Sequence, residues 1–81
     1  MLLLKKKEIT DNKITYYYQP EFKGKMGILT LYLPHRKFIA EAVAEYDTEY
    51  VSVFRRHALE HMLRYAAKKE YPDEEKIYWG L

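Results

Sequence analysis

The sequence contains no cysteine, and this absence removes several kinds of protein chemistry. Disulfide bonds and thiolate zinc sites are excluded, and so is a cysteine nucleophile. Ser52 is the only serine, and no glycine-rich loop of the phosphate-binding type is present. We therefore expect no catalytic residue, no cofactor and no small-molecule substrate.

Long apolar runs and a strong net charge are also missing. The apolar segment 2–4 is short and precedes the lysines at 5–7, which is the reverse of the order in a secretory signal. No stretch is long enough to span a bilayer. The formal net charge of +2 is too small to dictate a nucleic-acid or membrane partner. We expect a cytoplasmic protein with no membrane partner.

Aromatic residues are what the sequence has in quantity. Nine Tyr, three Phe and one Trp make up 16% of the 81 residues, and 32% of the residues are charged, which is typical of a globular chain. A chain of this length supports one core, so residues 1–81 are predicted to form a single domain. Such a small core has modest stability, which good packing or oligomerisation can raise.

Two segments have the pattern of strands. Residues 14–18 are β-branched and aromatic, and Pro20 ends the run. Asp11 and Asn12 before them suit a two-residue hairpin turn. Residues 25–33 alternate, with Leu29 and Leu31 on one face, and Gly27 indicates a bulge or a close approach of backbone.

The segment 37–46 fits two structures. At a period of two, one face carries Phe38, Ala40, Ala42, Ala44 and Tyr46; at a period of 3.6, several of the same side chains form a helical stripe. Alanine and glutamate favour the helix. We prefer a strand, because the turn at residues 34–36 would make a hairpin and the small alanines would let a helix lie close to the sheet.

A helix is predicted from residue 48 to Lys69, with Asp47 or Thr48 as its N-cap and Pro72 beyond its end. The acidic residues 73–75 look like an exposed turn, and the aromatic residues 77–81 should dock on the core or add an edge strand. The predicted fold class is α+β: an antiparallel three- to four-stranded meander, then one long amphipathic helix packed on one sheet face, then a short aromatic C-terminal strand or tail.

Several of these segments together resemble a family of small uncharacterised bacterial proteins. The similar segments are 16–21, 27–28, 46–50, 57–58 and 78–79. The resemblance implies two strands, a helix and an aromatic end. Because the family has no assigned activity, it implies no function.

His57, Glu60 and His61 match the His-x-x-Glu-His pattern of one class of zinc peptidases. Residues four apart face the same side of a helix, so the spacing suits a metal. Catalysis would also need a third protein ligand and a shaped cleft, which a chain with one small core can hardly supply. We therefore predict no metal ligand, and two solvated or hydrogen-bonded histidines on the polar flank of the helix; a weak metal site is a distant alternative.

The surplus of aromatic residues predicts an interaction surface for a protein partner or for self-association. The candidate residues lie on the outer sheet face and at the C-terminal end: Tyr17, Ile28, Tyr32, Tyr78 and Trp79. The alternative is single-stranded nucleic acid stacked on Tyr17 and Tyr32, with Lys13, Lys23, Lys25 and Arg36 nearby. Tyrosines that merely pack across neighbouring strands would account for the same pattern.

Overall fold

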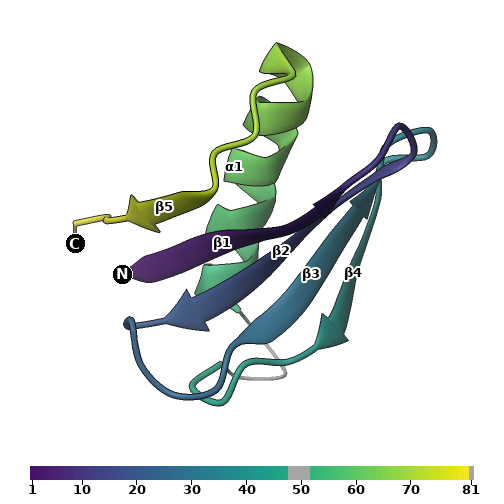
Figure 1. Ribbon diagram of the computed structural model, residues 1–81. Helices are drawn as coiled ribbons and strands as arrows, with labels where there is room; N and C mark the ends of the chain where they lie inside the picture. Colours follow the sequence, from purple (N-terminus) through teal and green to yellow (C-terminus); the bar gives the residue numbers. More distant parts are fainter. Residues whose placement is uncertain (48–51, 81) are drawn as a thin grey trace.

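The computed structural model describes residues 1–47 and 52–80. This part of the chain forms one antiparallel sheet and one helix (Figure 1). The elements in chain order are β1 (Leu2–Ile9), β2 (Lys13–Pro20), β3 (Gly27–Tyr32), β4 (Lys37–Ala42), α1 (Val53–Lys68) and β5 (Glu74–Ile77). The strands lie in the order β4-β3-β2-β1-β5, and each neighbouring pair is antiparallel. The α+β prediction is confirmed, and a fifth strand is present because β5 adds beside β1.

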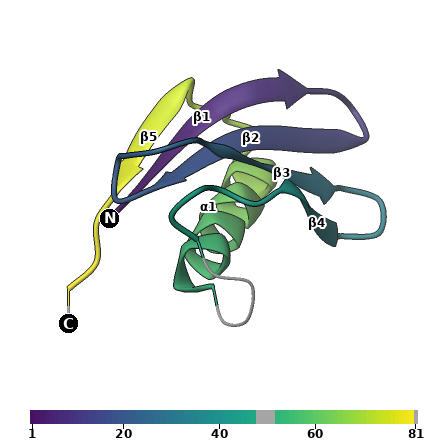
Figure 2. The ribbon, with the colours of Figure 1, turned by 90° about the horizontal axis from the view of Figure 1, so that it is seen from below.

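The helix α1 lies against one face of the sheet, where it packs on β1, β2 and β3 (Figure 2). Alternate residues of each strand point towards it, as the period of two requires. Full burial of a large apolar side chain contributes about 1.5–3 kcal/mol, so this single core is the main source of stability. Its members are Leu2, Leu4, Ile14, Tyr16, Tyr18, Leu29, Leu31, Ala44, Ala58, Met62, Tyr65 and Ile77.

The turn between β1 and β2 lies where the sequence predicts it. Ile9 pairs with Ile14, and the hydroxyl of Thr10 accepts hydrogen bonds from the backbone N–H groups of Asn12 and Lys13. In β1 the register shifts between Lys6 and Glu8. This bulge is how β1 accommodates three successive lysines, which break the alternation of apolar and polar residues.

Gly27 begins β3 at a close approach of backbone, as predicted. A Cβ atom at this position would lie 2.2 Å from the ring of Tyr18, 2.5 Å from the carbonyl oxygen of Ala42 and 2.6 Å from the nitrogen of Ala44. Two of these neighbours are backbone atoms, which cannot rotate away. Glycine is therefore required by the packing of β2 and of the segment after β4.

The segment 37–46 is a strand only up to Ala42. The choice of a strand is confirmed up to Ala42, but the predicted face does not continue as one strand face: Ala44 is buried, whereas Ala42 and Tyr46 are not. The register against β3 shifts between Ile28 and Leu29, so the alternation of β4 breaks near Glu41. Ala42 is exposed as a result, and Tyr46 lies beyond the strand with 48% of its surface exposed.

The helix begins later than predicted, because its N-cap is Ser52 and not Asp47 or Thr48. The Ser52 hydroxyl accepts a hydrogen bond from the Arg55 N–H (2.9 Å) and donates one to the Asp47 carboxylate (2.6 Å). Asp47 also pairs with the Arg55 guanidinium (3.0 Å), which explains an arginine on the apolar side of the helix. Thr48 lies outside the described residues.

The helix ends at Lys68, four residues before Pro72. Lys69 takes the left-handed conformation (φ 55°) that commonly closes a helix, and its N–H bonds back to the carbonyl of Tyr65. The chain then turns and enters β5, which pairs with β1 from Leu2 to Lys5. The predicted exposed acidic turn is therefore wrong in part, because Glu74 and Glu75 belong to a strand.

Candidate functional site

The outer face of the sheet, meaning the face turned away from α1, holds three of the five predicted interaction residues. Tyr16, Tyr18 and Leu29 are buried towards the helix, so alternation places Tyr17 and Ile28 on the opposite side. Tyr17 and Ile28 are direct partners across β2 and β3, and Tyr32 lies on the same face further along β3. All three side chains are half-buried.

A chain of polar contacts separates the two tyrosines of the outer face. Thr15 and Thr30 are direct partners, and their hydroxyl oxygens are 3.1 Å apart. Thr30 donates onward to the Glu41 carboxylate (2.7 Å). Although α1 lies on the other side, the two threonines are only 4% and 0% exposed, because the larger neighbouring side chains shield them. The outer face is therefore two partly apolar patches and not one continuous aromatic strip.

Lysines flank both tyrosines of the outer face. Lys5 is the partner of Tyr17 on β1, and Tyr32 lies between Lys13 and Lys37. The ammonium of Lys7 lies 5.9 Å from the centre of the Tyr17 ring, within the range of a cation–π contact. Carboxylates are interspersed among these cations, since Glu41 reaches Thr30 and Glu8 pairs with Lys13 (3.3 Å).

The basic residues predicted to form a nucleic-acid surface do not all lie on the outer face. Lys13 lies there, beside Tyr32. The Lys23 ammonium lies over the ring of Tyr46, 5.1 Å from its centre. Arg36 lies on the helix side of the sheet, where it lines a hollow beside Leu63.

The two C-terminal aromatic residues point to different places. Trp79 stacks on the ring of His57, with centres 4.0 Å apart and planes 12° from parallel, and meets Phe54 edge-on at 5.8 Å. Trp79 therefore docks on α1, away from the outer face. Tyr78 has 64% of its surface exposed and touches Phe22 edge-on at 5.6 Å. The structure thus divides the predicted surface of five residues into three places.

His57 and His61 do not converge on a common point with Glu60. Glu60 is 3.9 Å from Nδ1 of His57, whereas Nδ1 of His61 lies 3.0 Å from the Glu75 carboxylate. Both rings are half-buried. Of the two predicted alternatives, solvated or hydrogen-bonded, the second describes His61, whereas His57 is stacked on Trp79. Nowhere in residues 1–47 and 52–80 do three His, Asp or Glu side chains form a group that could hold a metal ion.

Glu75 is the centre of a polar cluster that the sequence does not reveal. The same carboxylate oxygen that faces His61 accepts a hydrogen bond from the Tyr65 hydroxyl. Burial is the main cause that raises the pKa of Tyr65, and this hydrogen bond raises it further. Tyr16, whose ring is 5.4 Å from that of Tyr65, donates to the Pro72 carbonyl (2.7 Å). The cluster joins β5 to the helix and to β2.

The polar cluster opens onto a cavity of about 470 Å³ that Arg64 and Lys68 also line. A carboxylate that orients a histidine is one part of an acid–base site. The described lining has no Ser, Thr or Cys side chain, and the Tyr65 hydroxyl donates to the Glu75 carboxylate. We interpret the contacts as a structural connection that positions β5.

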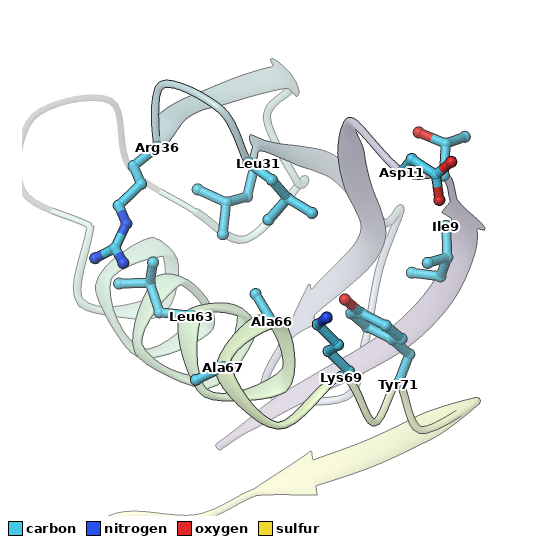
Figure 3. A pocket seen from close by; sticks show the side chains of 11 residues that line it. Ile9, Asp11, Leu31, Arg36, Leu63, Ala66, Ala67, Lys69 and Tyr71 are labelled. Atoms are coloured by element: carbon cyan, nitrogen blue, oxygen red, sulfur yellow. The ribbon is translucent and has the colours of Figure 1, made fainter.

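A second hollow, of about 640 Å³, lies between the C-terminal half of α1 and the hairpin ends of the sheet (Figure 3). Leu63 and Ala66 border it from the helix, and Leu31 borders it from the sheet. Leu63 is 37% exposed here. Arg36 stands at one end of the hollow beside Leu63.

No protein-family model, no curated protein and no solved structure matches this chain. In the part of the chain that the structure describes, no helix combines the length and the apolar character needed to cross a membrane.

Proposed function

We propose that this chain is a non-catalytic, cytoplasmic protein-interaction module that binds a protein partner through the outer face of its sheet. The observation that carries the proposal is the composition of that face: Tyr17, Ile28 and Tyr32 remain half-exposed with no described layer over them. Tyrosine is enriched at protein interfaces because its ring is apolar and its hydroxyl can hydrogen-bond. The flanking lysines favour a partner with carboxylates around an apolar centre.

Single-stranded nucleic acid is the second candidate, and the lysines beside each tyrosine favour it. Base stacking needs a free ring face, however, and Lys7 lies over the ring of Tyr17. Thr15 and Thr30 also separate the two tyrosines, so successive bases would not find a continuous surface. Glu8 and Glu41 on the same side would repel phosphates. These three features favour protein over nucleic acid.

Affinity capture with matched variants tests the proposal. The parent chain, a Tyr17→Ser/Tyr32→Ser variant and a Tyr78→Ser control are immobilised and exposed to nuclease-treated extract of the source cells. We expect one protein to be retained by the parent and by the control and to be lost from the double variant. The purified partner should then bind the parent in calorimetry, with affinity that falls as salt increases.

Equal capture by all three chains would contradict the proposal. Retention of nucleic acid, detected as absorbance at 260 nm that salt removes when nuclease is omitted, would favour the second candidate instead. Circular dichroism of each variant checks that the fold is kept.

A further inference from the structure

The strand β4 forms one edge of the sheet. In the described ranges it has a single neighbouring strand, β3, so its other side presents backbone N–H and C=O groups to any strand that approaches. Such an edge favours the addition of another strand, and the chemistry of its side chains decides which strand fits.

The sequence of β4 is complementary to itself in the antiparallel direction. If two copies of the strand are centred on Ile39, then Lys37 of each copy lies opposite Glu41 of the other. Phe38 then lies opposite Ala40, a large side chain beside a small one. Lys37 and Glu41 are exposed and the three residues between them are half-buried. Opposite charges in directly opposed positions stabilise a strand pair, and like charges destabilise it.

The same register also keeps the two sheets continuous. In an antiparallel pair, opposed residues must point to the same face. A two-fold axis perpendicular to the sheet must therefore set one residue opposite its own copy, and not opposite the copy of its neighbour. Ile39 lies on the outer face, since its partner Thr30 does. Glu41 is on that face too, because it accepts the hydrogen bond from Thr30. Both helices would lie on one side of the combined sheet.

We propose that β4 is a self-association surface, through which two copies of this chain pair antiparallel about Ile39 with Lys37 opposite Glu41. The inference concerns the edge of the sheet and does not rest on the proposed binding at the outer face. Lysine on an edge normally prevents pairing with unrelated strands. In the proposed pair, Lys37 instead lies opposite the Glu41 carboxylate of the second copy. An unrelated strand would need a carboxylate at the same position to pair as well.

The opposite edge of the sheet does not offer the same match. β5 has four residues, and the register centred on Glu75 would place Glu74 opposite Lys76, but it would also place Glu75 opposite Glu75 of the second copy. This central carboxylate is also held by the Tyr65 hydroxyl. The like-charge pair at the centre of β5 therefore favours β4 as the pairing edge, and β5 provides a control.

Charge exchange tests the proposal. The parent chain, Lys37→Glu, Glu41→Lys and an equimolar mixture of the two variants are measured by light scattering after size exclusion over a range of concentrations. We expect the parent to form a dimer. Each single variant should dissociate at least about tenfold more readily, because both symmetric ion pairs become like-charge pairs. The mixture should restore the dimer, since each variant supplies the charge that the other lacks, and native mass spectrometry should identify a heterodimer.

Lys76→Glu on β5 is the matched control, and it should dimerise like the parent. The proposal is overturned if the parent stays monomeric up to a concentration on the order of 1 mM, if the single variants dimerise as well as the parent, or if two folded variants fail to associate when mixed. Association with a different protein instead of a second copy would likewise refute it.

Glu41→Lys removes the acceptor of the Thr30 hydrogen bond, so this variant is checked by circular dichroism. If it does not fold, hydrogen exchange of the parent decides. Amides in residues 37–41 should gain protection as the concentration rises, whereas amides in residues 74–77 should not. Unchanged exchange in residues 37–41 would refute the pairing.

Discussion

Replacement of Tyr18 by Phe should show how much stability the chain draws from one buried hydroxyl. The Tyr18 side chain is fully buried, and its hydroxyl donates to the Asp47 carboxylate (2.6 Å) and accepts from the Ala44 N–H (3.0 Å). Phenylalanine keeps the ring and its packing. The substitution therefore removes two hydrogen bonds and almost no apolar area.

The loss can be estimated from those two contacts. A hydrogen bond to a charged group contributes about 1.5–3 kcal/mol, and a buried N–H left without a partner costs about 1–3 kcal/mol. Asp47 keeps the Ser52 hydroxyl and the Arg55 guanidinium, which limits the loss at the carboxylate. We expect the free energy of unfolding to fall by about 3 kcal/mol, a large fraction of the stability of a small domain.

Urea unfolding followed by circular dichroism measures this change. With a slope of about 1 kcal/mol per molar urea for a small domain, the midpoint should fall by about 3 M. Tyr17→Phe is the matched control on the neighbouring residue of the outer face, and it should change stability by less than about 0.5 kcal/mol. A loss below about 1 kcal/mol for Tyr18→Phe would refute the reasoning, because it would mean that Asp47 and Ala44 do not depend on this hydroxyl.

Two further predictions concern packing and pH. Gly27→Ala should cost about 3 kcal/mol or prevent folding, because its Cβ would overlap backbone atoms of Ala42 and Ala44, whereas Gly80→Ala, with no atom within 4 Å of the new Cβ, should leave thermal unfolding unchanged. Burial is the main cause that raises the pKa of both Tyr16 and Tyr18 from 10.0 to about 12. A raised pKa means that the folded state holds the proton more tightly, so this stability is complete below pH 10 and is lost as the pH rises towards 12. Urea midpoints measured from pH 9 to 12 should fall over that interval, and midpoints that stay constant would contradict the assignment.

Features with local causes could be predicted from the sequence. The turn at residues 11–12 depends on residues that tolerate its backbone, and the strand at residues 14–18 depends on β-branched and aromatic side chains. For the segment 37–46 periodicity alone leaves a helix open, and the adjacent turn and the small alanines favour the strand that forms at Lys37–Ala42. In each case the information lies within a few residues of the element it determines.

Features with tertiary causes could not be predicted. Asp47 has the right residue type for an N-cap, but Tyr18 from β2 and Arg55 from the helix hold its carboxylate, and Ser52 caps the helix instead. Glu75 belongs to an acidic run that indicates exposure, yet Tyr65 draws it towards the helix. The residues that hold Asp47 and Glu75 belong to other elements of the fold, so local sequence patterns do not reveal them.

Several of the polar side chains described above form contacts that hold the fold together. Two carboxylates that bond to buried tyrosines, Asp47 and Glu75, hold the start of α1 and the position of β5. His57 is stacked under Trp79, and His61 faces Glu75. With one helix to cover a five-stranded sheet, the chain can shield one face and pair the interior strands. The described elements leave the outer face and the two edge strands, β4 and β5, uncovered. For that reason we propose binding, through the outer face, the β4 edge or both, as the function.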